Sequence, residues 1–402
     1  MATTSAFPAY LVGLGSWFIP LGIQTVLFPW LVAVVLRMDA FAVGLAQMAL
    51  MAPALLFMPL GGMIADRGNP RLLLIRCHLL YSLPPFALAA IIWQGGLSFP
   101  LLLLYGVVMG SIGNYAVPTR DALLSTVAKG SLPSAVALVT ALQFLGQLIG
   151  IAIASSADRF GAETLLIFNG CLVLLGSLAV SMVPNPPPHP PIEHSSYWRS
   201  IVEGFEEARR SEQMWPVLLL NLGIGLFYIG PFASVLPVVV RDVHGGSAAE
   251  IAYINLAFFG GTIVASFAFA GLAKHLALRG RAMIVALIGG AVILAGMALL
   301  PAFPVLCTLC FIWGVGAGIT LTQGRTVLQI VAPPTHRARL MSLFQLGFTG
   351  GGPIGALLAG ALASVWGLTT AMLAPAIAMA MLIAFVVLRS RMWTMRTVEK
   401  TG

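Results

Sequence analysis

Residues 61–71 read Gly61-Gly62-Met63-Ile64-Ala65-Asp66-Arg67-Gly68-Asn69-Pro70-Arg71, a short charged stretch between two long apolar runs. The runs cover residues 41–63 and 72–93, and each reaches the roughly 20 residues that a helix needs to cross a bilayer. A connection this short predicts that the two helices lie adjacent and antiparallel. Gly61 and Gly62 would sit where these helices approach each other, and Pro70 would end the first turn. The three charged side chains would then form a cluster at the membrane edge.

The composition is that of a membrane protein. Only 8% of the 402 residues are charged, 59% are hydrophobic, and the mean hydropathy is +0.97. Soluble domains carry about 25% charged residues, so this class is excluded. The apolar runs are continuous rather than alternating, which favours helices over a β-barrel. The sequence therefore predicts an all-α protein with many transmembrane helices.

Twelve apolar segments are long enough to span a bilayer: 8–36, 41–64, 72–94, 99–127, 133–156, 163–183, 213–240, 248–273, 281–300, 303–331, 338–364 and 367–388. The only long polar interval, 184–212, separates six spans from six. We therefore expect an N-terminal bundle over 1–183, a cytoplasmic linker over 184–212, and a second bundle with a short tail over 213–402. A short amphipathic helix is predicted within the linker at 198–210.

The distribution of basic residues predicts the orientation. With a cytoplasmic N-terminus, 16 of the 21 Lys and Arg residues fall in cytoplasmic loops or tails or within five residues of them. The positive-inside rule supports this arrangement, with both termini cytoplasmic. The basic pI of 9.7 then reflects topology, and no nucleic-acid partner is expected.

The two halves contain similar sequence segments at corresponding positions. Residues 110–124 read GSIGNYAVPTRDALL and residues 314–329 read GVGAGITLTQGRTVLQ. Each segment has closely spaced small residues, then polar groups, then an arginine near the end of the fourth helix of its half. Gene duplication explains the similarity; shared membrane composition is the alternative.

The opening stretch resembles the loop between helices 2 and 3 of the major facilitator superfamily. Gly62, Ile64, Ala65, Asp66 and Arg67 match the family pattern in register, and Arg71 supplies a basic residue at its end. The pattern's second glycine falls on an asparagine, and a proline replaces a basic residue. The resemblance implies two six-helix pseudo-repeats that alternate access to a central site. It also implies that Gly62, Asp66, Arg67 and Arg71 act as the gating motif.

Within that superfamily, residues 114–124 and 325–333 resemble the branch of enterobactin-type siderophore exporters and related drug exporters. In the superfamily fold, helices 1, 4, 7 and 10 line the central cavity. The polar residues on those helices are the expected substrate-cavity residues: Gln24, Asn114, Tyr115, Arg120, Asn221, Tyr228, Thr322, Gln323 and Arg325. For each polar residue the alternative is an interhelical hydrogen bond. For Arg120 and Arg325, the structural interpretation is that each side chain reaches the lipid headgroups. The functional interpretation is that the two arginines receive an anionic substrate or form ion pairs in a gate.

No carboxylate lies in the middle of a predicted span, so Asp121 and Asp66 are the candidates for coupling to protons. The six histidines are expected in loops or at span ends, and no Cys/His cluster or phosphate-binding loop is present. We therefore expect no enzyme activity, no metal and no cofactor.

The expected function is export of an amphipathic, siderophore- or drug-like small molecule by a monomer in a bacterial inner membrane, energised by protons. The alternatives are an importer or a lipid flippase of the same fold, and a non-transporting membrane receptor.

Overall fold

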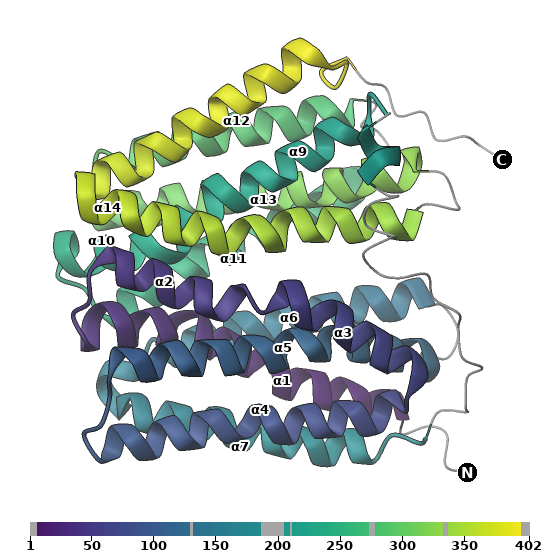
Figure 1. Ribbon diagram of the computed structural model, residues 1–402, viewed down its shortest axis with the longest axis vertical. Coiled ribbons are helices and arrows are strands. Elements are labelled where there is room, and N and C mark those ends of the chain that lie inside the picture. The colour runs from purple at the N-terminus through teal and green to yellow at the C-terminus, as the bar shows by residue number, and fades with distance from the viewer. Residues whose placement is uncertain are drawn as a thin grey trace. The chain divides into compact units, whose positions relative to one another are not determined.

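A computed structural model describes residues 6–128, 132–185, 205–209, 211–272, 278–332 and 337–394. All regular structure in these ranges is helical and none of it is strand, as Figure 1 shows. The all-α prediction is therefore confirmed.

The first half of the chain forms α1 (Ala6–Trp30), the π-helical segment η1 (Leu31–Val35), α2 (Ala40–Met51), α3 (Ala54–Arg67), α4 (Pro70–Trp93), α5 (Phe99–Val127), α6 (Leu132–Ala154) and α7 (Ala157–Ser181). The second half forms α9 (Met214–Ile224), the π-helical segments η2 (Gly225–Ile229) and η3 (Pro231–Val235), α10 (Leu236–His244), α11 (Ala248–Leu272), α12 (Arg279–Met297), α13 (Phe303–Val331) and α14 (Arg337–Arg389).

Eleven helical segments of the described residues are long and apolar enough to cross a membrane. The last of them runs over 50 residues, or about 75 Å at the helical rise, which is more than twice the hydrocarbon thickness. Gly367 interrupts it with a left-handed φ of 86°, at the boundary predicted between the last two spans. This segment therefore holds two crossings, which makes twelve.

The chain divides into two compact units. Unit 1 consists of Met1–Arg37, Ala49–Glu193 and Gly246–Ala252, and unit 2 of Met38–Met48, His194–Gly245 and Tyr253–Gly402. In unit 1, α1 packs against α6 and α7, and α4 packs against α5 and α7. In unit 2, α14 packs against α9, η2, η3 and α12, and α12 packs against α13. Two short segments, 38–48 and 246–252, thus belong to the unit formed mainly by the other half of the sequence.

Paired glycines bring helix backbones into contact in both units. A Cβ on Gly22 of α1 would lie 2.1 Å from the Gln147 carbonyl oxygen of α6, and one on Gly150 would lie 2.0 Å from the Ile19 carbonyl oxygen. In unit 2, a Cβ on Gly225 would lie 2.9 Å from the Cα of Gly351. Only glycine permits this approach, which provides the dispersion contact that holds helices together in lipid.

The stretch from Gly61 to Arg71 differs from its prediction in two ways. Helix α3 continues to Arg67, and Asn69 caps α4 by accepting a hydrogen bond from the Leu72 amide at 3.2 Å. Pro70 occupies the first position of α4, where its missing N–H costs nothing. The proline therefore starts a helix instead of ending a turn.

Gly61 also faces a different neighbour than the short connection suggested. A Cβ at this position would lie 2.3 Å from the Tyr115 carbonyl oxygen of α5, and α3 packs mainly on α5, not on α4. The tight turn brings the ends of α3 and α4 together, but side-chain packing along their length decides which helices stay in contact. The prediction of close α3–α4 packing at the two glycines was wrong.

The seventh span departs from regular α-helix over η2 and η3. Pro231 begins η3, and its ring nitrogen has no hydrogen to give to the helical ladder. The local widening changes the direction of the side chains that follow, and π-turns of this kind are common at functional sites.

Most of the predicted amphipathic helix of the linker lies outside the described residues. Residues 205–209 are helical. Phe205 packs edge-on against Trp215 with ring centroids 5.2 Å apart, and Ala208 is fully buried. This part of the linker is docked on the start of α9.

The glycine contact between α1 and α6 predicts a measurable stability difference. Gly22→Ala places a methyl group on the backbone of α6, so we expect a loss of about 1–3 kcal/mol from overpacking. Gly15→Ala in the same helix is the matched control, because a Cβ there meets nothing within 4 Å. Thermal unfolding of the purified variants in detergent, followed by size-exclusion chromatography, measures both. Equal melting of the two variants would contradict the contact.

Candidate functional site

An aromatic and polar cluster joins α1 and α4 in unit 1. Tyr81 stacks on Trp17 with ring centroids 4.5 Å apart, and its hydroxyl donates a hydrogen bond to Gln24 Oε1 at 2.9 Å. Gly113 of α5 faces the Tyr81 ring. Gln24, a predicted cavity residue, is thus 5% exposed and already paired.

Arg120 of α5 adds a cation to this cluster. Its guanidinium carbon lies 5.3 Å from the centroid of the Trp17 ring and 5.2 Å from that of Phe18. The Tyr10 hydroxyl donates to the Arg120 carbonyl oxygen at 2.9 Å. The arginine is therefore half-buried among aromatic rings of α1, and its backbone is held by one of them.

His78 of α4 corrects the expectation that every histidine lies in a loop or at a span end. The side chain is fully buried within α4 and meets the Trp17 ring edge-on at 4.9 Å. One ring nitrogen lies 2.9 Å from the Leu74 carbonyl oxygen and the other lies 3.2 Å from that of Gly13. These contacts make His78 an interhelical tie between α4 and α1.

A second aromatic cluster forms in unit 2. Trp313 of α13 meets Tyr228, Phe232 and Phe258 edge-on, at centroid distances of 5.6, 5.9 and 5.8 Å. The Tyr228 hydroxyl donates to the Leu287 carbonyl oxygen at 2.6 Å. Gly290 makes room, since a Cβ there would lie 2.9 Å from the Tyr228 ring. Tyr228, a predicted cavity residue, is thus brought together with three aromatic side chains.

The remaining predicted cavity residues lie in varied surroundings. Asn114 and Thr322 donate to carbonyl oxygens of their own helices, at 2.8 and 2.7 Å, and Asn221 donates to the Phe344 carbonyl oxygen. Tyr115 is half-buried. Only Asn221 thus makes the interhelical hydrogen bond that the sequence left open as the alternative, whereas Asn114 and Thr322 bond within their own helices.

Gln323 and Arg325 differ sharply although they are two residues apart. Gln323 is fully buried, and neither its amide nitrogen nor its oxygen finds a hydrogen-bond partner in the described ranges. Arg325 is exposed. Arg120 and Arg325 occupy corresponding sequence positions but do not share an environment.

The candidate gating and coupling residues lie at the ends of α3 and α5. Gly62 is half-buried in α3, and the side chains of Asp66 and Arg67 lie outside the described part of the structure. Asp121 is exposed. Arg71 donates to Asn185 Oδ1 at 2.8 Å and to the Ser181 carbonyl oxygen, which ties the start of α4 to the end of α7 within unit 1.

The described residues contain no group of three or more His, Cys, Asp or Glu side chains that could hold a metal ion. The two clusters instead combine large aromatic surfaces with single hydrogen-bonding groups. In the described state the rings of Trp17, Tyr81, Tyr228 and Trp313 are only 2–7% exposed, so they stabilise contacts between helices.

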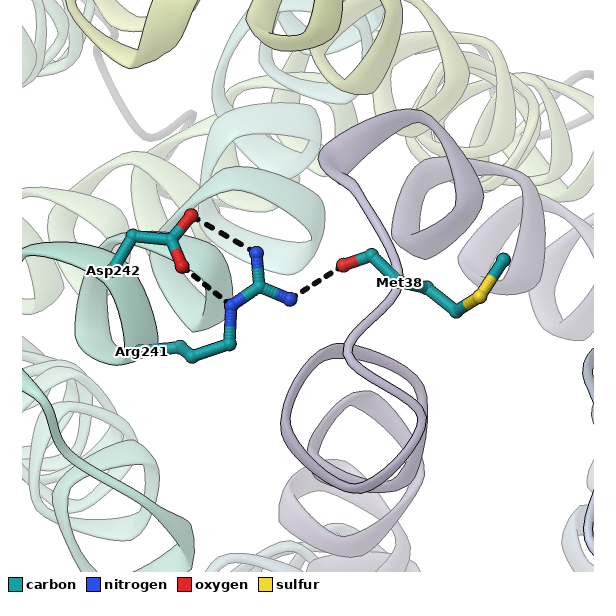
Figure 2. A network of polar contacts seen from close by, with 3 residues as sticks. All are labelled: Met38, Arg241 and Asp242. Atoms are coloured by element: carbon teal, nitrogen blue, oxygen red, sulfur yellow. Dashed lines mark hydrogen bonds and ion pairs between the residues drawn. The ribbon is translucent and has the colours of Figure 1, made fainter.

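Two polar networks that the sequence did not reveal hold the exchanged segments 38–48 and 246–252. In unit 2, Asp39 caps α2 by accepting from the Ala42 amide at 3.0 Å and from the Ser364 hydroxyl at 2.8 Å. Arg241 donates to the Met38 carbonyl oxygen at 2.5 Å and pairs with both oxygens of Asp242, as Figure 2 shows.

In unit 1, the corresponding network centres on Asp158 of α7. Its carboxylate accepts from the Ser247 hydroxyl and from the Ala248 amide, the latter at 3.0 Å. Trp30 donates its ring N–H to the same hydroxyl at 2.8 Å. Each network thus uses one aspartate and one serine to cap the start of an exchanged segment.

The sequence carried a weak signal for these networks. Ser247 and Glu250 have the spacing of a capping box, and Glu250 accepts from the Ser247 amide at 2.8 Å. The pairing of Asp158 with Ser247 spans 89 residues and has no local signature.

The networks predict selective loosening of the exchanged segments. Ser364→Ala removes the bond to Asp39 and the acceptor of the Phe41 amide, so amide hydrogen exchange over 40–44 should quicken by about three- to tenfold, which corresponds to one net hydrogen bond. Exchange over 248–252 should not change. Ser155→Ala is the control, because that hydroxyl donates to the nearby Ala152 carbonyl oxygen at the end of α6. Equal acceleration in the control would contradict the assignment.

Comparison with known proteins agrees with this architecture. The chain matches the family described as Major Facilitator Superfamily over residues 7–334 and 232–400. It is 26% identical over 94% of its length to the multidrug efflux pump Tap of Mycolicibacterium fortuitum, covering 92% of that protein. It is 27% identical over 82% of its length to the multidrug resistance efflux pump PmrA of Streptococcus pneumoniae, covering 81% of that protein.

Solved structures show the same fold at low identity. A bacterial homologue of the human lysosomal transporter Spinster superposes with a TM-score of 0.74 at 17% identity, with 98% of both chains covered. The nucleoside transporter NupG superposes with a TM-score of 0.73 at 13% identity, covering 96% of this chain and 98% of that one. The chain belongs to the major facilitator superfamily and is a membrane transporter, not an enzyme.

Proposed function

We propose that the protein exports amphipathic, drug-like small molecules across the membrane by alternating access. The observation that carries this proposal is similarity along most of the chain to two efflux pumps, 94% for Tap and 82% for PmrA. Similarity over nearly the whole length involves both bundles and not one shared motif.

The chemistry of the two aromatic clusters supports an amphipathic substrate. Trp17 and Tyr81 in unit 1, and Tyr228 and Trp313 in unit 2, are 2–7% exposed in the described state, and in the proposed cycle they meet a substrate when the surrounding helices move apart. Aromatic faces bind many ring systems with similar energy, whereas a dense polar site would select one substrate. Clusters of this type favour a broad range of apolar compounds.

In the proposed cycle, residues 1–183 rock against residues 213–390 around a central site. Gly62, Asp66, Arg67 and Arg71 form the gating motif, and protons drive export through Asp121 or Asp66. The Asp39 and Asp158 networks hold the exchanged segments in the described state, and both must break for those segments to leave their units.

A membrane position follows from charge and exposed surface. Many large apolar side chains are exposed along the helices, including Trp93 at 86% and Leu388 at 84%, and lipid would cover them. The positive-inside distribution supports cytoplasmic termini. We propose a monomer in a bacterial cytoplasmic membrane.

Siderophore export remains the finer alternative, based on the resemblance of residues 114–124 and 325–333 to that branch. Import is a second alternative, since NupG is a nucleoside transporter of the same fold. The remaining alternatives are a lipid flippase and a non-transporting membrane receptor. The direction of movement and the chemical class of the cargo separate all of them in one assay.

The test compares accumulation of fluorescent drugs, siderophores and labelled lipids in cells that lack or express the protein. Expression should lower drug accumulation, and a protonophore should abolish the difference. Higher accumulation on expression would replace the proposal with import, and a response to siderophores alone would select that branch. No response to any compound would refute export of these classes.

Asp66→Asn tests the gating motif in the same assay. Removing the charge should reduce export at least about tenfold, as expected when a charge-assisted contact is lost in one state of the cycle. The protein should remain folded by size-exclusion chromatography. Glu212→Gln is the control, because Glu212 is an exposed acidic residue of the linker. Normal export by Asp66→Asn would remove this residue from the mechanism.

A further inference from the structure

The Arg120 guanidinium lies against aromatic rings, and no carboxylate of the described residues is hydrogen-bonded to it. Trp17 and Phe18, which are 2% and 3% exposed, lie against it from α1. Its Nη1 atom is buried and has no hydrogen-bond partner among the residues that the structure describes. The residue as a whole is half-buried, so a ligand can approach its exposed part, whereas Nη1 itself must turn outward to meet the ligand.

The neighbouring groups do not complete the arginine's bonding. The Tyr10 hydroxyl is used on the Arg120 backbone, and both His78 ring nitrogens lie against carbonyl oxygens. Gln24 Oε1 accepts from Tyr81. Asp121, the next residue along the helix, is exposed. Its charge interacts with Arg120, but its side chain starts about 100° away around the helix axis.

The energetics of this arrangement favour an anionic ligand. Aromatic faces attract a guanidinium by about 0.5–2 kcal/mol, but they do not accept its in-plane N–H bonds. A buried charged donor without a partner costs about 1–3 kcal/mol or more. A carboxylate matches the planar fork of an arginine with two parallel hydrogen bonds, and apolar walls strengthen the attraction by excluding water.

We propose that Arg120, braced by Trp17 and Phe18, forms a carboxylate-binding subsite, so that the protein recognises aromatic carboxylic acids in addition to uncharged compounds. The inference rests on the proposed transport function and names a substrate class for it. The subsite belongs to unit 1. In unit 2, Arg325 is exposed, so its surroundings differ from those of Arg120.

The experiment uses a matched pair of ligands, pyrenebutyrate and its neutral amide pyrenebutyramide. The purified full-length protein is placed in phosphatidylcholine nanodiscs without anionic lipid, so that no lipid headgroup supplies a net negative charge. Pyrene fluorescence reports binding of both ligands. The wild-type protein should bind the carboxylate at least about tenfold more tightly than the amide, which is the strength of one charge-assisted contact.

Two variants of Arg120 test whether this residue causes the preference for the carboxylate. Arg120→Gln should weaken pyrenebutyrate binding about tenfold or more and leave pyrenebutyramide binding within about twofold. Arg120→Lys keeps the charge but loses the planar fork, so an intermediate loss for the carboxylate alone is expected. Arg76→Gln is the charge-matched control, because Arg76 lies exposed on α4 of the same unit, and both ligands should bind it as they bind the wild type.

Other outcomes overturn the subsite. Equal loss of both ligands in the Arg120 variants would show that the arginine only supports the packing of α1. A wild-type protein without preference for the carboxylate would refute the proposal even if neither variant folds. If the carboxylate subsite is refuted, the proposal of drug export still stands or falls by the accumulation assay, because the pyrene measurement reports binding and not transport.

Discussion

Direct backbone contact between helices is the constraint on which the rest of the structure depends. In lipid, apolar side chains gain little by leaving their surroundings, so helices associate through close packing instead of the hydrophobic effect. Gly22 and Gly150 provide that contact between α1 and α6, and Gly225 and Gly351 provide it between the seventh span and α14. The aromatic clusters are positioned by the helices that these glycines hold.

Each of the two units contains an aromatic cluster, but the clusters differ in geometry and charge. Both place a tryptophan and a tyrosine in contact, but Trp17 packs face to face with Tyr81, whereas Trp313 meets Tyr228 edge-on. Unit 1 adds a guanidinium to its rings, and unit 2 adds two phenylalanines. The cluster of unit 1 thus combines aromatic rings with a positive charge, whereas the cluster of unit 2 consists mainly of apolar rings.

The exchanged segments connect the fold to its proposed movement. Met38–Met48 packs within unit 2, where Asp39 and Ser364 hold its start, and Gly246–Ala252 packs within unit 1, where Asp158 and Ser247 do the same. Single hydrogen bonds of this kind contribute about 1 kcal/mol each. Contacts of that size order a helix end but can be broken without unfolding a bundle.

The sequence by itself determined the helical class, the twelve crossings and the break near Gly367. Bilayer thickness sets the length that an apolar helix needs to span it, and that length can be recognised without knowing which segments pack together. The sequence also marked Gln24, Arg120 and Tyr228, since polar residues in apolar helices are costly and few. Only the tertiary structure decided that Gly61 packs on α5, that His78 and Tyr81 join Trp17, and that Arg120 and Arg325 differ. The reason is that a helix's face and neighbours depend on packing between segments far apart in the chain, for which local composition has no signal.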